Sequence, residues 1–437
     1  MGQGKEPPRL PDGGFAAWSR DRLGLARRGA EECGDVWELE PGVYVAAAAG
    51  PCEAVLRRAH DFPKASSPLF PPLNLKRSSG APAPTPEERA YAHAARMRGL
   101  RAQAVAARIG EIAPRSARFA DQWPTGQDIE ILPPVRHTLA EIGVSYLFSE
   151  DAPALLPHAA QLFLAREVLV RPSRWVWPRW VPTPARRFRT RQQVAFTEAL
   201  RPVVHRRRSS GRLGDDMLGQ MLRPSPHYGL LPEEAVLDTL PGITVATFET
   251  PSRAAAWILL QLARHPRAAD RVAAEAAVLP ADPAATTGSH LADLRYTQAL
   301  VSEVLRLYPP SWLLTRQAPR QTQLADYTIG AGSTVLVCPY TAHRDAREFS
   351  EPDRFRPERW LGDAGSPEKP GLFLAFGTGP HGCEGTSLAM AMLTLLTAQT
   401  ARRYHLSEPP GPEPGYRVTT LEGLAPVGLR LRATSRD

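Results

Sequence analysis

The chain has 437 residues, of which 43% are hydrophobic and 22% are charged. This composition indicates a globular protein with a real core and excludes a fully disordered, collagen-like or coiled-coil chain. The formal net charge is +8, but only 4 of the 53 basic residues are lysine, and the basic residues are spread along the chain. The charge therefore reflects an arginine-rich composition more than a phosphate-binding surface, and no nucleic-acid partner is expected.

The four cysteines are Cys33, Cys52, Cys338 and Cys383, and no two of them form a CxxC pair. A disulfide framework is therefore not expected. No apolar run reaches the ~18 residues that cross a bilayer, and the start of the chain lacks the apolar segment of a signal peptide. We expect a cytoplasmic protein with no membrane anchor.

In chain order, a Pro/Gly-rich leader of residues 1–34 precedes an alternating segment at 35–48, which predicts a hairpin with Pro41 and Gly42 at its turn. Residues 66–86 show no periodicity and predict a long loop. Residues 87–113 are rich in Ala and Arg and predict a helix. The rest of the chain, residues 35–437, is expected to form a single domain.

Further along, residues 170–185 hold three tryptophans among prolines, a composition that breaks helices and favours a loop. Residues 231–265 predict a long central helix, residues 292–307 a second helix, and residues 386–404 a last long helix. Between them, the β-branched residues of 313–340 predict a small sheet. Helices far outnumber strands, and the strands cluster near the two ends of the chain, so the fold class is mainly α.

The sharpest motif is the segment 376–385, FGTGPHGCEG, whose glycines and proline force a tight backbone loop. Its thiol, on Cys383, lies directly before the last helix, where the helix N-terminus stabilises a thiolate. Such a thiolate is a metal ligand or a nucleophile. A zinc site needs further Cys or His ligands at close spacing, and a cysteine protease needs a base, for which the sequence offers only unplaced histidines.

This segment resembles, position for position, the FxxGx[RH]xCxG signature of the cytochrome P-450 superfamily, in which the Cys thiolate is the proximal ligand of haem iron. The positions that the resemblance assigns to haem binding are Phe376, Gly377, Gly379, His381, Cys383 and Gly385. Two more segments are similar to motifs of the family. Glu303 and Arg306 match its ExxR helix, and Arg359 in FRPERW would complete a buried salt-bridge triad.

The segment 242–251, GITVATFETP, resembles the oxygen-binding part of the family's central helix. The resemblance places Ala246 at the haem, Thr247 and Phe248 at the substrate pocket, and Glu249 and Thr250 as the acid and alcohol that deliver protons during O2 activation. Two residues depart from the pattern. Thr247 replaces a glycine, which predicts a narrower pocket with an added hydroxyl, and Pro251 predicts a kink centred on 247–251.

The resemblance also implies contacts with the haem propionates and the substrate. Arg316 and His381 match positions that pair with the propionates, and a guanidinium suits a carboxylate. His93 is expected to join them, with Arg98 or Arg96 as its companion. Ser311 and Leu313 are expected to face the substrate pocket, which the loops at 66–86 and 175–180 would cover.

Taken together, the resemblance implies the triangular helical prism of the family, with small β-sheets near its two ends. The cofactor would be haem b (iron protoporphyrin IX), with O2 as co-substrate and electrons from NAD(P)H through a ferredoxin and its reductase. The expected protein is a monomeric monooxygenase that hydroxylates, epoxidises or oxidatively couples a small molecule, in secondary-metabolite or antibiotic biosynthesis (terpenoid, polyketide or peptide). The alternatives are a haem-thiolate peroxygenase or isomerase, and a catalytically silent haem-binding partner protein.

Overall fold

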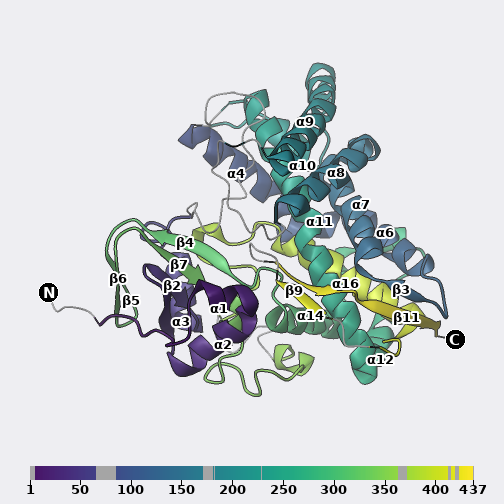
Figure 1. Cartoon of the computed structure of the whole chain (residues 1–437). Coiled ribbons are helices and arrows are strands. Elements are labelled where there is room, and N and C mark those ends of the chain that lie inside the picture. Colours follow the sequence, from purple (N-terminus) through teal and green to yellow (C-terminus); the bar gives the residue numbers. More distant parts are fainter. Residues whose placement is uncertain are drawn as a thin grey trace. The chain divides into compact units, whose positions relative to one another are not determined.

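A computed structural model describes residues 5–64, 85–170, 181, 183–227, 229–362, 372–411, 415–418 and 423–436. Apart from their ends, the predicted loop at 66–86 and the tryptophan-rich segment at 170–185 lie outside these residues. The chain divides into two compact units, each built from separate segments (Figure 1). Unit 1 comprises residues 1–73, 299–383 and 416–425, and unit 2 comprises residues 74–298, 384–415 and 426–437.

Unit 1 contains small sheets and short helices. Its elements are α1 (Phe15–Arg20), α2 (Arg22–Glu32), β1 (Val36–Glu40), β2 (Val43–Ala46), α3 (Ala49–Arg57), β4 (Leu314–Ala318), β5 (Thr322–Leu324), β6 (Tyr327–Ile329), β7 (Ser333–Val337) and α15 (Pro339–Ala342). A four-stranded sheet has the order β1-β2-β7-β4, and β5 pairs with β6. The predicted hairpin is confirmed, because β1 and β2 are antiparallel and Gly42 adopts φ +76° at the turn.

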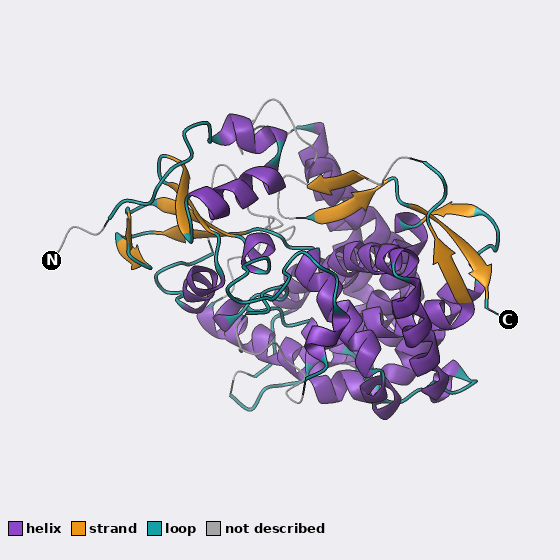
Figure 2. Cartoon of the chain, turned by 90° about the horizontal axis from the view of Figure 1, so that it is seen from below, coloured by secondary structure: helices purple, strands orange, loops and turns teal. Residues whose placement is uncertain are grey.

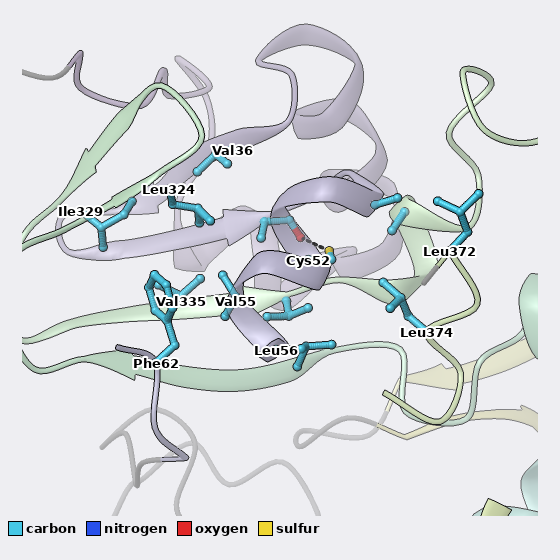
Figure 3. Close-up of a cluster of buried hydrophobic side chains, with 14 of the residues drawn as sticks. Val36, Cys52, Val55, Leu56, Phe62, Leu324, Ile329, Val335, Leu372 and Leu374 are labelled. Carbon is cyan, nitrogen blue, oxygen red and sulfur yellow. Dashed lines mark hydrogen bonds between the residues drawn. The ribbon is translucent and has the colours of Figure 1, made fainter. Parts of the chain in front are cut away.

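Strand β7 lies between two neighbours, parallel to β2 and antiparallel to β4, and all five of its residues are buried. Its hydrophobic side chains join a core formed with α3, which includes Val36, Val55, Leu56 and Val335 (Figure 3). A strand between two neighbours with every residue buried favours a continuous apolar run, and Val335, Leu336 and Val337 form such a run after the polar Ser333 and Thr334. The core fixes α3, the helix against which the cysteine loop is built.

The predicted leader does not stand apart from unit 1, because residues 15–32 form two helices that pack into it. Trp18 on α1 is buried and stacks on Trp312, with ring centroids 5.6 Å apart. Gly29 on α2 lies under Trp37, where a Cβ would come within 2.2 Å of the indole ring. Glycine is therefore required at this close approach.

Unit 2 is mainly helical. Figure 2 colours the helices of the chain purple and its strands orange. The elements of unit 2 are α4 (Pro86–Leu100), α5 (Ala102–Ala107), α6 (Ile109–Asp121), β3 (Asp128–Glu130), α7 (Leu132–Phe148), α8 (Ala152–Val170), α9 (Pro184–Ser210), α10 (Met217–Leu222), α11 (Glu233–Arg264), α12 (Pro266–Glu275), α13 (Gly288–Asp293), α16 (Thr386–Arg403), β8 (Tyr404–Ser407) and β11 (Arg430–Ser435). Helix α11 packs against α7, α8, α9 and α16, and β11 pairs with both β3 and β8. The predicted mainly α fold class with small sheets is confirmed.

Three elements lie at the borders of the two units: α14 (Arg295–Leu307), β9 (Gly415–Val418) and β10 (Leu424–Val427). The helices predicted at 231–265, 292–307 and 386–404 correspond to α11, α14 and α16. The helix predicted at 87–113 is wrong as a single element. Arg101 adopts extended dihedral angles between α4 and α5, and Arg108 separates α5 from α6.

Candidate functional site

The loop that carries Cys383 is shaped by two glycines with left-handed backbone angles, Gly377 at φ +66° and Gly379 at φ +71°. A Cβ on Gly379 would lie 2.6 Å from the carbonyl oxygen of Leu56 on α3, so only glycine fits this position. The backbone N–H of Cys383 donates to the carbonyl of Phe376 at 2.8 Å, which closes the loop. The thiol is thereby held three residues before α16 begins.

Cys383 differs from the other three cysteines in its exposure. All four lie in the described part of the chain, none of them forms a disulfide there, and Cys383 alone is exposed. Burial raises the pKa of Cys52 and Cys338, which lie in the core, and it also raises the pKa of the half-buried Cys33. Because the thiolate is the form that binds metals, Cys383 is the cysteine best placed to act as a ligand.

Two cationic side chains of unit 1, Arg316 and Lys64, lie near His381 of this loop. His381 lies on the short 3-10 turn Gly379–His381, and Arg316 is almost fully buried on β4. The pKa of His381 is lowered by partial burial and by the positive charges of Lys64 and Arg316. A group of positive charges so close together is suited to an anionic ligand, such as a carboxylate.

The predicted triad of Glu303, Arg306 and Arg359 is assembled in unit 1. Arg306 donates to both carboxylate oxygens of Glu303 at 2.8 and 2.9 Å, and Arg359 donates at 3.1 Å. The indole of Trp360 adds a bond at 2.9 Å that the sequence had not suggested. Burial alone would raise the pKa of Glu303, but Arg306, Trp360 and Arg359 together hold it below its usual range.

His343 connects this triad to the cysteine loop, and sequence reasoning missed it. Its Nδ1 lies 3.0 Å from the carbonyl oxygen of Arg306, and its Nε2 accepts the backbone N–H of Leu374 at 2.8 Å. Burial, with the charge of Arg306, lowers the pKa of His343 to about 3. The ring is therefore neutral and carries its proton on Nδ1. The sequence offered only one signal, a histidine in the HRD segment that follows the predicted sheet.

In unit 2, α11 presents the predicted residues 246–250 on different faces of the helix. Ala246 is exposed and Thr250 is half-buried, and their spacing of four places them on one face. Glu249 is buried and forms an ion pair with Arg253, at 2.8 Å between Nη2 and Oε1. Phe248 is fully buried against Phe163 of α8, with centroids 5.7 Å apart.

Thr247 packs against α7, where it faces Gly143. A Cβ on Gly143 would lie 2.2 Å from the Thr247 hydroxyl oxygen, so the two positions are complementary. The hydroxyl donates to the carbonyl of Thr244 at 2.7 Å. The hydroxyl oxygen keeps its capacity to accept a hydrogen bond, and the expectation that Thr247 adds a hydroxyl to the pocket stays a prediction. Helix α11 also continues past Pro251 to Arg264, so the proline does not end the helix.

On α4, His93 and Arg96 both contact Glu384, the residue after Cys383. Nδ1 of His93 lies 2.7 Å from the carboxylate, and Arg96 donates to both of its oxygens at 2.6 and 2.9 Å. Burial alone would raise the pKa of Glu384, but Arg96 and His93 outweigh burial and lower it. Arg98 instead donates to the carbonyl of Gln220 at 3.2 Å, so Arg96 is the arginine that shares Glu384 with His93. The expected contact of His93 and Arg98 with a propionate stays a prediction.

The two predicted pocket residues after α14 are placed in unit 1. Ser311 forms a β-bridge with Gly423, and Leu313 is buried. Between them, Trp312 is buried and stacks on Trp18. The predicted site residues are thus divided between the units: the cysteine loop, Arg316 and the triad belong to unit 1, and the α4 and α11 residues belong to unit 2.

Among the described residues, no group of three or more His, Cys, Asp or Glu side chains is arranged to hold a metal ion. No helix in the described ranges is long and apolar enough to cross a membrane.

Comparisons with known proteins agree with these features. The sequence profile of the family described as Cytochrome P450 matches residues 159–425. Cyclooctat-9-en-7-ol 5-monooxygenase of Streptomyces melanosporofaciens is 30% identical over 318 residues, which cover 70% of this chain and 68% of that protein. Pentalenene oxygenase of Streptomyces avermitilis is 30% identical over 262 residues, covering 59% of this chain and 57% of the relative.

Solved structures show the same fold. The retinoic acid bound cyanobacterial CYP120A1 covers 100% of both chains with a TM-score of 0.82 at 18% identity. The cytochrome P450DA heme domain covers 100% of this chain and 98% of its own, with a TM-score of 0.80 at 20% identity. The predicted fold is thereby confirmed.

Proposed function

Because the chain belongs to the cytochrome P450 family, we propose that Cys383 ligates haem iron and that the protein oxidises a small organic molecule with O2. The chain is an oxidoreductase of the monooxygenase class, and family membership implies haem and O2. The observation that carries the residue-level proposal is the exposed Cys383 thiol in a glycine-shaped loop, with His381 and the positive charges of Arg316 and Lys64 nearby.

The donor set of unit 1 fits this cofactor. Haem brings iron, which takes a thiolate ligand, and two propionates, which need cationic partners. Cys383 would supply the thiolate, and Arg316 and His381 would hold propionates. The Glu303 network and His343 would keep the loop in shape, because each bond they make is to a buried, fixed partner.

Haem with a thiolate ligand supplies, when bound, the chemistry that activates O2. The residues of α11 would supply the protons that this activation consumes. The Thr250 hydroxyl can donate and accept, and it lies on the same face of α11 as Ala246. Glu249 precedes it and holds a carboxylate that can exchange protons with water, while Arg253 fixes one of its oxygens.

The substrate class follows from the relatives alone and belongs to the proposal. Two Streptomyces relatives are named as oxidising cyclooctat-9-en-7-ol and pentalenene. We extend this to a terpenoid or a similarly apolar natural product, hydroxylated, epoxidised or oxidatively coupled in secondary metabolism. Candidate terpenes would be screened by their shift of the haem spin-state spectrum. Turnover under ¹⁸O2 should then place one ¹⁸O atom in a hydroxylated or epoxidised product.

The same assay separates the alternatives. A peroxygenase would turn over with peroxide and without NAD(P)H, an isomerase would incorporate no ¹⁸O, and a silent haem-binding protein would give no product. The buried Glu249 with its Arg253 partner supports the monooxygenase, because the acid is held where α11 also presents Thr250. Product formation that requires neither O2 nor NAD(P)H would overturn the proposal.

We further propose that electrons arrive from NAD(P)H through a ferredoxin reductase and an acidic ferredoxin, and that the enzyme works as a cytoplasmic monomer. The net charge of +8 supports an acidic partner. Rising ionic strength should then slow electron transfer. A rate that does not change with salt would contradict electrostatic docking of the ferredoxin.

A further inference from the structure

Glu384 places a carboxylate directly after the cysteine of the loop, at a position that the signature FxxGx[RH]xCxG leaves open. Two residues of α4 contact this carboxylate, and one of them, Arg96, forms a bidentate ion pair with it. Arg96 donates from Nε at 2.6 Å and from Nη2 at 2.9 Å, and Nδ1 of His93 lies at 2.7 Å. A bidentate pair of this kind fixes both position and charge.

The pair is partly withdrawn from solvent. The Glu384 side chain is 26% exposed and that of Arg96 is 19% exposed, whereas His93 is 52% exposed. In such surroundings a charge acts over a longer range than it does in water. The charges of Glu384 and Arg96 therefore matter to the neighbouring thiolate, which is one peptide bond away along the chain.

The sign of each effect follows from electrostatics. Reduction adds an electron to the site, so a nearby negative charge disfavours the reduced state and a nearby positive charge favours it. Glu384 alone would disfavour reduction. Arg96 offsets that charge, and because its fork is fixed on the carboxylate, the compensation is built into the fold.

We propose that the Arg96–Glu384 pair balances charge beside Cys383 and thereby sets the reduction potential of the haem that this cysteine would bind. The inference rests on the proposed function of Cys383. It assigns positioning roles to Arg96 and His93 through a protein carboxylate, in place of the direct propionate contact expected for His93.

The test is the midpoint potential of the haem-loaded full chain, measured by spectroelectrochemistry in variants with opposite charge changes. Glu384→Gln should raise the potential and Arg96→Gln should lower it. Each shift should be about tenfold in the equilibrium constant for reduction, which is about 59 mV for a one-electron couple. The double variant should lie between the two single variants, close to the wild type.

Two controls separate charge from structure. Arg96→Lys keeps the positive charge but loses the fork, so its potential should stay near that of the wild type. Arg101→Gln removes an equal charge from the exposed cap of α4 and should shift the potential little. If both single variants shift in the same direction, or neither moves further than Arg101→Gln, the inference is wrong.

The ferrous carbon monoxide spectrum of each variant distinguishes this failure from failure of the proposed function. If the wild type gives no thiolate-type spectrum, the assignment of Cys383 has failed. If all variants give that spectrum but their potentials do not separate by sign, the haem assignment stands and the charge-balancing role of Glu384 is excluded.

Discussion

The cysteine loop of unit 1 and the α11 segment of unit 2 differ in how their polar groups are held. Behind the loop, Glu303 accepts hydrogen bonds from Arg306, Arg356, Arg359 and Trp360, and all of these partners are fixed by the fold. On α11, by contrast, Glu249 has an ion pair with a residue of its own helix, and Thr247 bonds to its own helix backbone.

This contrast indicates where the sequence is free to vary. Removing one member of a hydrogen-bond network leaves its partners unsatisfied. A single substitution there therefore costs most of the stabilisation that the network provides. A local pair on one helix can be exchanged together with one neighbour. The motif residues Glu303, Arg306 and Arg359 lie in the buried network of unit 1, whereas the two departures from the family pattern, Thr247 and Pro251, lie on α11.

The largest effect should come from breaking the unit 1 network. Glu303→Ala removes the acceptor of a buried pair and leaves Arg306 as an uncompensated buried charge, at a cost of about 3–5 kcal/mol in the free energy of unfolding. Urea denaturation measures the loss. Glu53→Gln removes the same charge from an exposed pair with Arg57 and should cost under about 1 kcal/mol. Equal losses of unfolding free energy in the two variants would show that the buried network stabilises the fold no more than an exposed ion pair does.

His343→Leu should be the next largest change. It leaves the N–H of Leu374 and the carbonyl of Arg306 without their partner, which costs about 2–4 kcal/mol at pH 7.5. Since the pKa of His343 is lowered to about 3, the unfolded chain binds a proton below about pH 6.5 while the folded chain does not.

The stability that the neutral ring provides is therefore complete above about pH 6.5 and declines as pH falls toward 3, by about 1.4 kcal/mol per pH unit. Leucine does not titrate, so the gap between the wild type and His343→Leu should narrow over that window. Unfolding measured at a series of pH values checks this. A constant gap would mean that His343 takes up its proton over the same pH range in the folded and in the unfolded chain.

Gly143→Ala tests whether a residue of α11 can be substituted together with its one neighbour on α7. The new methyl group would meet the Thr247 hydroxyl at 2.2 Å, which should cost about 1–3 kcal/mol of stability. Adding Thr247→Gly should recover much of that loss. Gly50→Ala on α3, where a Cβ meets nothing within 4 Å, is the matched control and should be neutral or slightly stabilising. No recovery in the double variant would argue against direct packing of the two positions.

Arg253→Gln should have the smallest effect on stability but a measurable effect on turnover. With its carboxylate no longer fixed, Glu249 should deliver protons less efficiently. The rate of product formation should fall about tenfold for each 1.4 kcal/mol by which the activation free energy rises. More NAD(P)H should be consumed per product. Arg253→Lys should recover part of the rate, and Arg267→Gln, an exposed residue on α12, should leave it unchanged. If Arg253→Gln consumed no more NAD(P)H per product than the wild type, Arg253 would have no role in positioning Glu249.

The sequence was sufficient for the parts of the molecule that depend on local patterns. The turn at Pro41 and Gly42, the length of α11 and the start of α16 each follow from residues close together in the chain. The break of the predicted 87–113 helix was not foreseen. Arg108 there donates to the carbonyl of Tyr146 on α7, a partner 38 residues away.

Long-range pairs account for the other omissions. The contact of His93 with Glu384 joins residues 291 positions apart, and the bond from Leu374 to His343 joins segments 31 positions apart. The ion pair of Arg253 with Glu249 could have been predicted from the sequence, because a spacing of four on a helix favours such a pair.

The proposed haem site depends most directly on Cys383 as the ligand of iron. The test is the spectrum of the reduced, carbon monoxide-treated, haem-loaded protein, with Cys383→Ser compared to Cys33→Ser, which makes the same atomic change at a half-buried thiol of unit 1. The wild type and Cys33→Ser should both show the red-shifted Soret band of a ferrous thiolate complex, and Cys383→Ser should lose it. A red-shifted band that persists in Cys383→Ser, or is absent from the haem-loaded wild type, would contradict the account.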